Sequence, residues 1–247
     1  MASTTWYSQE YWQASRAPRY SLLFALPLLV AYEVLAVLLG GGSPEQLRNG
    51  ADVLLRAPFL ALVGPRGPLI FEVSLIGVGL WLVARDLRAH KGALQKGVFA
   101  AMLGESLVLA LAVGVVVGGI TAKLLGLVLP GQTPVEALGT WTKLMLSLGA
   151  GLYEELLFRV ILVGALAWAG HRLFGWRPLV AGGMAVLLGA LIFSAFHYLG
   201  PYGDPLELPS FLFRTIAGLF FSALYVLRGF GITAWTHALY DVFLLVV

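Results

Sequence analysis

The segment GLYEELLFR, residues 151–159, places three ionisable side chains inside an apolar run that extends from Leu138 to Gly170. The three are Glu154, Glu155 and Arg159. An ionised side chain at the middle of a bilayer costs about 2.5–3.5 kcal/mol on translocon scales unless it is paired or faces a cavity. The segment therefore predicts a polar site enclosed by membrane helices.

The composition of the whole chain is that of a membrane protein. Hydrophobic residues make up 59% of the 247 residues and charged residues 12%, with a mean hydropathy of +0.87. In an ordinary soluble domain roughly a quarter of the residues are charged. Because no polar stretch is long enough for a soluble domain, we expect residues 1–247 to form a single integral-membrane domain. The chain has no cysteine and no basic run of the kind that binds nucleic acid.

Apolar stretches mark the expected membrane spans, each of about 20 residues. The predicted fold is all-α, a polytopic transmembrane helical bundle of about seven spans plus one short interfacial or re-entrant helix at Ala51–Val63, which Arg56 interrupts. The seven spans are Tyr20–Gly40, Pro68–Ala84, Val98–Leu129, Leu138–Gly170, Pro178–Leu199, Pro209–Leu227 and Ile232–Val247.

Basic residues between the spans predict the orientation. They fall in alternate connections, which the positive-inside rule assigns to the cytoplasm. The N-terminus is then cytoplasmic and the C-terminus outside, and the high Ala, Gly, Leu and Val content favours a bacterial inner membrane. The residues that decide the orientation are Arg85, Arg88, Lys91, Lys96, Arg172, Arg177 and Arg228.

The spacing within the acidic motif separates a pair from a single carboxylate. On a helix, Glu155 and Arg159 are four residues apart, share a face and can pair. Glu154 lies about 100° round the helix from Glu155. The motif thus predicts an orienting ion pair and one free carboxylate. The alternative is a structural network in which both glutamates pack against other helices with Arg159 between them.

Two histidines lie in or at the ends of apolar helices late in the chain. His197 follows Phe193 by four residues in LIFSAFHYLG (191–200), and His237 precedes Asp241 by four in TAWTHALYD (233–241). A single buried histidine is more often structural than catalytic. Two of them, with a glutamate on a third helix, provide what the activation of water requires: a carboxylate to take the proton, an imidazole to hold the water, and donors to an oxyanion.

In this order and spacing, the elements EExxxR (154–159), FxxxH (193–197) and HxxxD (237–241) resemble the CPBP intramembrane proteases. This group contains the type II CAAX prenyl endopeptidases and the bacteriocin-processing or self-immunity (Abi-like) proteins. The resemblance covers about residues 100–247, so residues 98–247 are expected to be the catalytic core. The N-terminal helices in residues 1–97, including Glu33, lie outside the motifs, and the roles of Glu33 and Glu105 stay open.

The resemblance implies hydrolysis of a peptide bond near the terminus of a membrane-associated peptide or protein. The implied roles are Glu154 as the base that activates water, His197 as its holder, His237 with Asp241 at the oxyanion, and Glu155, Arg159 and Phe193 in support. Asparagine is common at the last motif position. An ionised Asp241 accepts but cannot donate a hydrogen bond, so it either carries a proton or orients His237.

Three alternatives remain at this level. Glu154, His197, His237 and Asp241 could hold zinc, although HExxH is missing and metal-independent glutamate chemistry is favoured. Intramembrane acids and histidines also mark proton-coupled transporters, and an inactive member of the family could act as a membrane scaffold.

If every span were straight and complete, the two histidines would differ in depth by well over about 10 Å. We therefore expect some helices to be short, broken or tilted.

Overall fold

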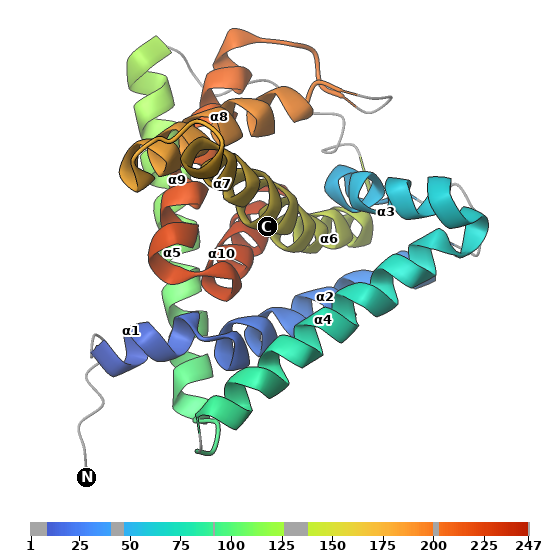
Figure 1. Cartoon of the computed structure of the whole chain (residues 1–247). Helices are drawn as coiled ribbons and strands as arrows, with labels where there is room; N and C mark the ends of the chain where they lie inside the picture. Colours follow the sequence, from blue (N-terminus) through green and yellow to red (C-terminus); the bar gives the residue numbers. More distant parts are fainter. Residues whose placement is uncertain (1–8, 41–46, 91, 126–137, 200–202, 247) are drawn as a thin grey trace.

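The computed structural model describes residues 9–40, 47–90, 92–125, 138–199 and 203–246 (Figure 1). These ranges are helical without a strand, so the expected all-α fold is confirmed. The elements in chain order are α1 (Gln9–Arg16), α2 (Pro18–Gly40), α3 (Gly50–Val63), η1 (Gly64–Arg66), α4 (Gly67–Ala89), α5 (Lys96–Leu125), α6 (Thr140–Gly149), η3 (Ala150–Val163), α7 (Gly164–Arg172), α8 (Pro178–Phe196), α9 (Leu208–Arg228) and α10 (Phe230–Leu245).

Five helical stretches in the described ranges are long and apolar enough to cross a membrane. They are Pro18–Gly40, Gly50–Ala89, Lys96–Leu124, Pro178–Phe196 and Leu208–Arg228. The expected count of seven spans is therefore not confirmed. The expected span at 138–170 is divided among α6, η3 and α7, and α10 has only 16 residues, fewer than the roughly 20 of a complete span.

The short helix expected at Ala51–Val63 is present as α3, and η1 joins it to α4. Gly64 lies in the left-handed region at φ 68°, which a residue without a Cβ adopts at little cost. At Gly67 a Cβ would come within 2.3 Å of the Phe59 backbone, so this position also needs glycine. The turn brings α3 back against α4, where Phe59 and Phe71 meet edge to face.

Helix α10 is the central element of the bundle and packs against α2, α5, α6, η3 and α9 (Figure 1). Its approach to η3 depends on Gly151. A Cβ at this position would lie 2.3 Å from the Ala234 carbonyl oxygen and 2.6 Å from the Ala238 Cβ. Small residues at such contacts allow helix backbones to come close together. Gly151 therefore brings the acidic motif alongside α10.

The acidic motif lies in a π-helix, η3. Such helices form i→i+5 hydrogen bonds, are rare, and usually last a single turn near a functional site. Here the π-helical stretch covers 14 residues between two α-helices. Glu154, Glu155 and Arg159 are all buried in it, so the three ionisable groups face the interior of the bundle.

The N-terminal helices pack directly on this segment. Helix α2 contacts α4 and α6, and α3 contacts η3. The rings of Tyr32 on α2 and Tyr153 on η3 meet edge to face, with centroids 5.2 Å apart. They belong to a buried apolar cluster with Ala25, Leu29, Ala36, Ala51, Phe71, Met145 and Leu152.

Candidate active site

Three helical segments contribute the predicted site residues, and Phe193 lies beside both of the histidines. Glu154 comes from η3, His197 directly follows α8, and His237 lies in α10. The Phe193 ring centroid is 4.8 Å from that of His197 and 6.4 Å from that of His237. The two histidines thus share one neighbour.

The His197 ring has a defined orientation. Its Nδ1 lies 2.9 Å from the Phe193 carbonyl oxygen, which can only accept, so the Nδ1–H donates. In the neutral ring this leaves Nε2 as an acceptor. On the other side of the residue, the His197 carbonyl accepts from the Asp204 N–H at 3.0 Å, and the Asp204 carboxylate pairs with Arg214 of α9. The residues after α8 therefore hold His197 in place.

Glu154 and His197 face each other across a gap. Glu154 Oε2 lies 4.0 Å from His197 Nε2, and the two side chains are 9% and 25% exposed. This separation is too long for a direct hydrogen bond, but it leaves room for a water that would lie about 2.8 Å from each atom and bridge them at a bent angle. Such a water donates one hydrogen to the carboxylate and one to Nε2. An oxygen lone pair is then free to attack a substrate.

The other oxygen of Glu154 has a partner that the motifs do not include. Asn49, immediately before α3, donates its amide Nδ2–H to Glu154 Oε1 at 2.8 Å. In the sequence, the one available signal was an asparagine before an apolar helical stretch, which indicates a helix N-cap and nothing about catalysis. This contact joins residues 105 positions apart.

Glu155 connects Arg159 to His237. Its Oε2 is 3.2 Å from Arg159 Nε, and its Oε1 is 2.7 Å from His237 Nδ1. The expected i,i+4 pair is present in the π-helix, with exposures of 0% for Glu155 and 1% for Arg159. The guanidinium also lies over the Phe193 ring, 4.4 Å from its centroid. Glu155 therefore orients His237, a role that the sequence suggested for Asp241.

His237 presents its other nitrogen toward Asp241. Nε2 and Asp241 Oδ2 are 3.7 Å apart, beyond a direct hydrogen bond. The imidazole stacks on Phe221, with ring centroids 4.4 Å apart and an interplanar angle of 18°. With Nδ1–H on Glu155, a neutral ring can only accept at Nε2, and donation from Nε2 requires a second proton.

Within the described ranges, no three His, Asp or Glu side chains are arranged as a group that could hold a metal ion. Glu154 and His197 share one contact region, and His237 and Asp241 form a separate pair. Binding of zinc by all four residues would require them to be brought closer together. Zinc-dependent hydrolysis is therefore an alternative mechanism, which a chelator experiment tests.

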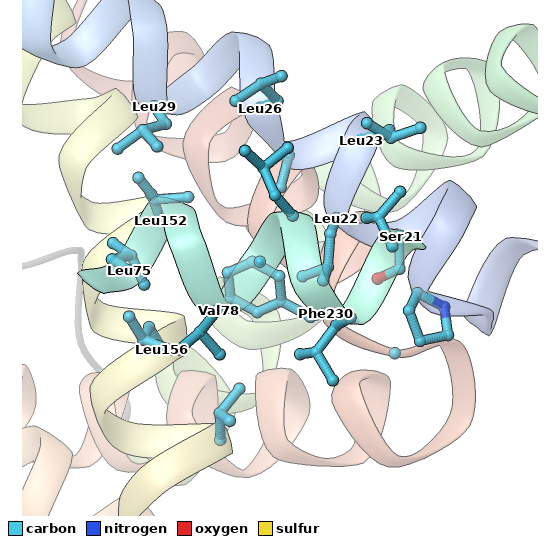
Figure 2. Close-up of a pocket in the computed structure, with 18 of the residues that line it drawn as sticks. Ser21, Leu22, Leu23, Leu26, Leu29, Leu75, Val78, Leu152, Leu156 and Phe230 are labelled. Atoms are coloured by element: carbon cyan, nitrogen blue, oxygen red, sulfur yellow. The ribbon is translucent and has the colours of Figure 1, made fainter. Parts of the chain in front are cut away.

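An apolar cavity of about 610 Å³ is lined in part by other residues of η3. Leu152, Leu156 and Val160 contribute to its wall together with residues of α2 and α4. Figure 2 shows Leu152 and Leu156 with Leu29 of α2 and Leu75 of α4. Its lining is mostly aliphatic and does not include Glu154, His197 or His237. The cavity is consequently separate from the polar site.

Comparison with known proteins supports the interpretation of the motifs. Residues 136–243, somewhat less than half of the chain, match the family model described as type II CAAX prenyl endopeptidase Rce1-like. Searches among curated proteins and among solved structures gave no significant match. The matched region contains all three sequence motifs and the residues that converge around Phe193. Over this region the chain, an integral membrane protein, is similar to the type II CAAX prenyl endopeptidases, which supports the predicted resemblance to the CPBP intramembrane proteases.

Proposed function

We propose that this protein is an intramembrane endopeptidase that uses water activated by Glu154 to cleave a peptide bond near the terminus of a membrane-associated peptide or protein. One observation carries the proposal: Glu154 Oε2 and His197 Nε2 face each other at 4.0 Å, while the second polar atom of each side chain already has a partner. The two remaining atoms are thus reserved for a shared water.

The reaction follows from this arrangement. The water oxygen attacks the carbonyl carbon of the peptide bond as Glu154 takes one of its protons, while His197 Nε2 accepts a hydrogen bond from the other. A C–O bond forms, and the carbonyl oxygen becomes the oxyanion of a tetrahedral intermediate. When the C–N bond breaks, protonated Glu154 returns its proton to the leaving amine. The immediate products are a carboxylic acid and an amine, and Glu154 is regenerated. The acid then loses the second proton of the water, which the amine takes up, so the final products are a carboxylate and an ammonium group.

His237 is the proposed donor to the oxyanion. Its ring is fixed by Glu155 at Nδ1 and by stacking on Phe221, so Nε2 has a defined direction. In the doubly protonated form it donates to the developing negative charge, the type of contact worth about 10²–10³ in kcat in other hydrolases. Asp241, 3.7 Å from Nε2, is the counter-charge for this form.

We propose that the protein acts in a bacterial inner membrane with its N-terminus in the cytoplasm, since the basic residues favour that side. Its partners are the lipid bilayer and a membrane-associated substrate. A prenylated CAAX peptide is the first substrate class to test because the matched family is named for it. Proteins with removable leaders or C-terminal anchors are the second class.

The test compares membrane proteomes from cells that produce the wild type or Glu154→Gln, with enrichment of protein N- and C-termini. We expect shortened termini that occur only with the wild type. Purified wild type in detergent is also incubated with a farnesylated CAAX peptide, and the products are identified by mass spectrometry. Glu207→Gln is the matched control, since it makes the same change at an exposed glutamate. Identical termini in all strains, with an intact peptide, would indicate a scaffold or transporter instead.

A further inference from the structure

Asn49 is the one asparagine of the chain, and it lies outside both the sequence motifs and the region matched to the protease family. We infer that Asn49 is a positioning residue for Glu154, held in place by the N-terminal helices α2, α3 and α4. The inference rests on the proposed role of Glu154 as the base. It gives the N-terminal third of the chain a direct part in the site.

The orientation of the Asn49 amide is set by its contacts. Oδ1 accepts from the Ala51 backbone N–H at 2.9 Å, as an N-cap does for α3. Because this contact requires an oxygen, the amide nitrogen must be the atom that faces Glu154. The backbone N–H of Asn49 donates to the Tyr32 hydroxyl at 3.1 Å. With 7% exposure, the residue is enclosed and fixed on three sides.

A partly buried charged network lies behind Asn49. Tyr32 donates to Asp52 at 2.9 Å, and Asp52, which is 0% exposed, pairs with both Arg48 and Arg56. The two arginines also bind Glu33, at 3.1 Å from Arg48 and 2.7 Å from Arg56. Glu33, which the motifs left unexplained, is thereby part of the support for Asn49.

The same network contacts the residue next to Glu154. The Tyr153 hydroxyl lies 3.0 Å from Glu33 Oε1 and 3.3 Å from Glu72 Oε2, and Arg56 pairs with Glu72 at 2.8 Å. Tyr153 is 0% exposed. Two successive residues of η3 are therefore attached to the N-terminal helices, Tyr153 through its hydroxyl and Glu154 through Asn49. This attachment fixes both the position and the rotation of the Glu154 carboxylate.

The Asn49 contact has two consequences for the proposed reaction. It engages Oε1, so Oε2 is the oxygen left to face the water and His197 Nε2. A hydrogen bond donated to a carboxylate also favours its ionised form, which is the form that acts as a base. Without this donor, Glu154 is free to rotate away from the water. A misplacement of about 1 Å can cost about 100-fold in rate.

Two variants separate this role from simple capping of α3. Asn49→Ser keeps an N-cap oxygen, but its shorter side chain does not reach Glu154. Asn49→Asp also keeps the cap, and it places a carboxylate where the donor was. Gln95→Glu is the control, because it makes an amide-to-acid change at an exposed side chain of the N-terminal third. Glu154→Gln is included in every experiment as the reference for loss of the base.

The experiment measures kcat, KM and the pH dependence of cleavage of a farnesylated CAAX peptide, together with shortened termini in cells and the Tm of each protein. We expect kcat to fall about 10- to 100-fold in Asn49→Ser and further in Asn49→Asp, with KM little changed. In Asn49→Asp the acidic limb of the pH profile moves to higher pH, because a neighbouring carboxylate disfavours ionised Glu154. Gln95→Glu behaves as wild type.

The outcomes distinguish the inference from the function on which it rests. If Glu154→Gln is inactive while both Asn49 variants keep wild-type kcat, the positioning role is wrong and the protease remains. The Asn49 variants could instead lose activity only in proportion to the loss of folded protein, with an unshifted pH profile. That result would show that Asn49 acts only as the N-cap of α3, and it would also overturn the inference. Cleavage by Glu154→Gln, or no cleavage in either assay by the wild type, would instead refute the proposed function.

Discussion

Replacement of Glu155 by glutamine tests the ion pair that organises the site. The carboxylate lies 3.2 Å from Arg159 Nε and 2.7 Å from His237 Nδ1. Glu155→Gln leaves the Arg159 guanidinium, which is 1% exposed, without its ion-pair partner. Loss of one partner of a buried pair costs about 3–5 kcal/mol, whereas an exposed pair contributes about 0–1 kcal/mol. The contact of Arg159 with the Phe193 ring is unchanged, so we expect the lower end, about 3 kcal/mol.

The assay is thermal unfolding of the purified protein in detergent. For a chain of about this length, each kcal/mol corresponds to roughly 2–4 °C in Tm, which gives an expected decrease of about 6–12 °C for Glu155→Gln. Cleavage should fall as well, because the His237 ring loses the carboxylate that fixes it. Glu207→Gln, at an exposed glutamate, should leave both Tm and cleavage unchanged.

A second variant identifies the orphaned charge as the cause. Glu155→Gln combined with Arg159→Met removes the guanidinium together with its partner, so the double variant should have a higher Tm than Glu155→Gln alone. Its cleavage activity should stay low because the orientation of His237 is not restored. A single variant with the Tm and activity of the wild type would refute the pairing and its connection to His237.

Three further predictions test other parts of the site. If no metal takes part, Asp241→Asn should keep much of the cleavage activity, and the wild type should resist a strong chelator. If instead the chelator inactivates the wild type, zinc restores its activity and Asp241→Asn is inactive, the protein is a metalloprotease. Gly151→Ala should lower Tm and cleavage because its Cβ meets the α10 backbone at 2.3 Å, while Gly164→Ala, with no atom within 4 Å, should lower neither. Tyr153→Phe should lower stability by about 1.5–3 kcal/mol in denaturant titration, since it removes the hydroxyl next to two partly buried carboxylates, Glu33 and Glu72, which keep only their arginine partners.

The local pairs of the site were predictable from spacing. Glu155 and Arg159 pair as the four-residue separation predicts, and Phe193 and His197 are likewise in contact. In each case helical backbone keeps residues i and i+4 close to each other on one face, in the π-helix η3 as well as at the C-cap of α8. The location of all three motifs within the region that matches the protease family confirms the family prediction.

The contacts between helices were not predictable in the same way. Asn49 reaches Glu154 across 105 positions and Glu155 reaches His237 across 82, and both depend on how helices pack rather than on local spacing. The count of spans failed for a related reason. Hydropathy measures the length of an apolar run, but it does not detect that the run at 138–170 is divided among α6, the π-helical segment η3 and α7.

The charges around His237 suggest how an aspartate can serve at a position where the family commonly has asparagine. Two carboxyl groups flank the ring, Glu155 at Nδ1 and Asp241 near Nε2, and Arg159 balances only the first. An unbalanced charge in a buried site is costly, so a ring protonated on both nitrogens is the form that suits two neighbouring carboxylates. That form donates from Nε2, as an oxyanion requires. With an amide at position 241 the second carboxylate is gone, and the amide itself can donate. We infer that the two residue types support the same step by different routes.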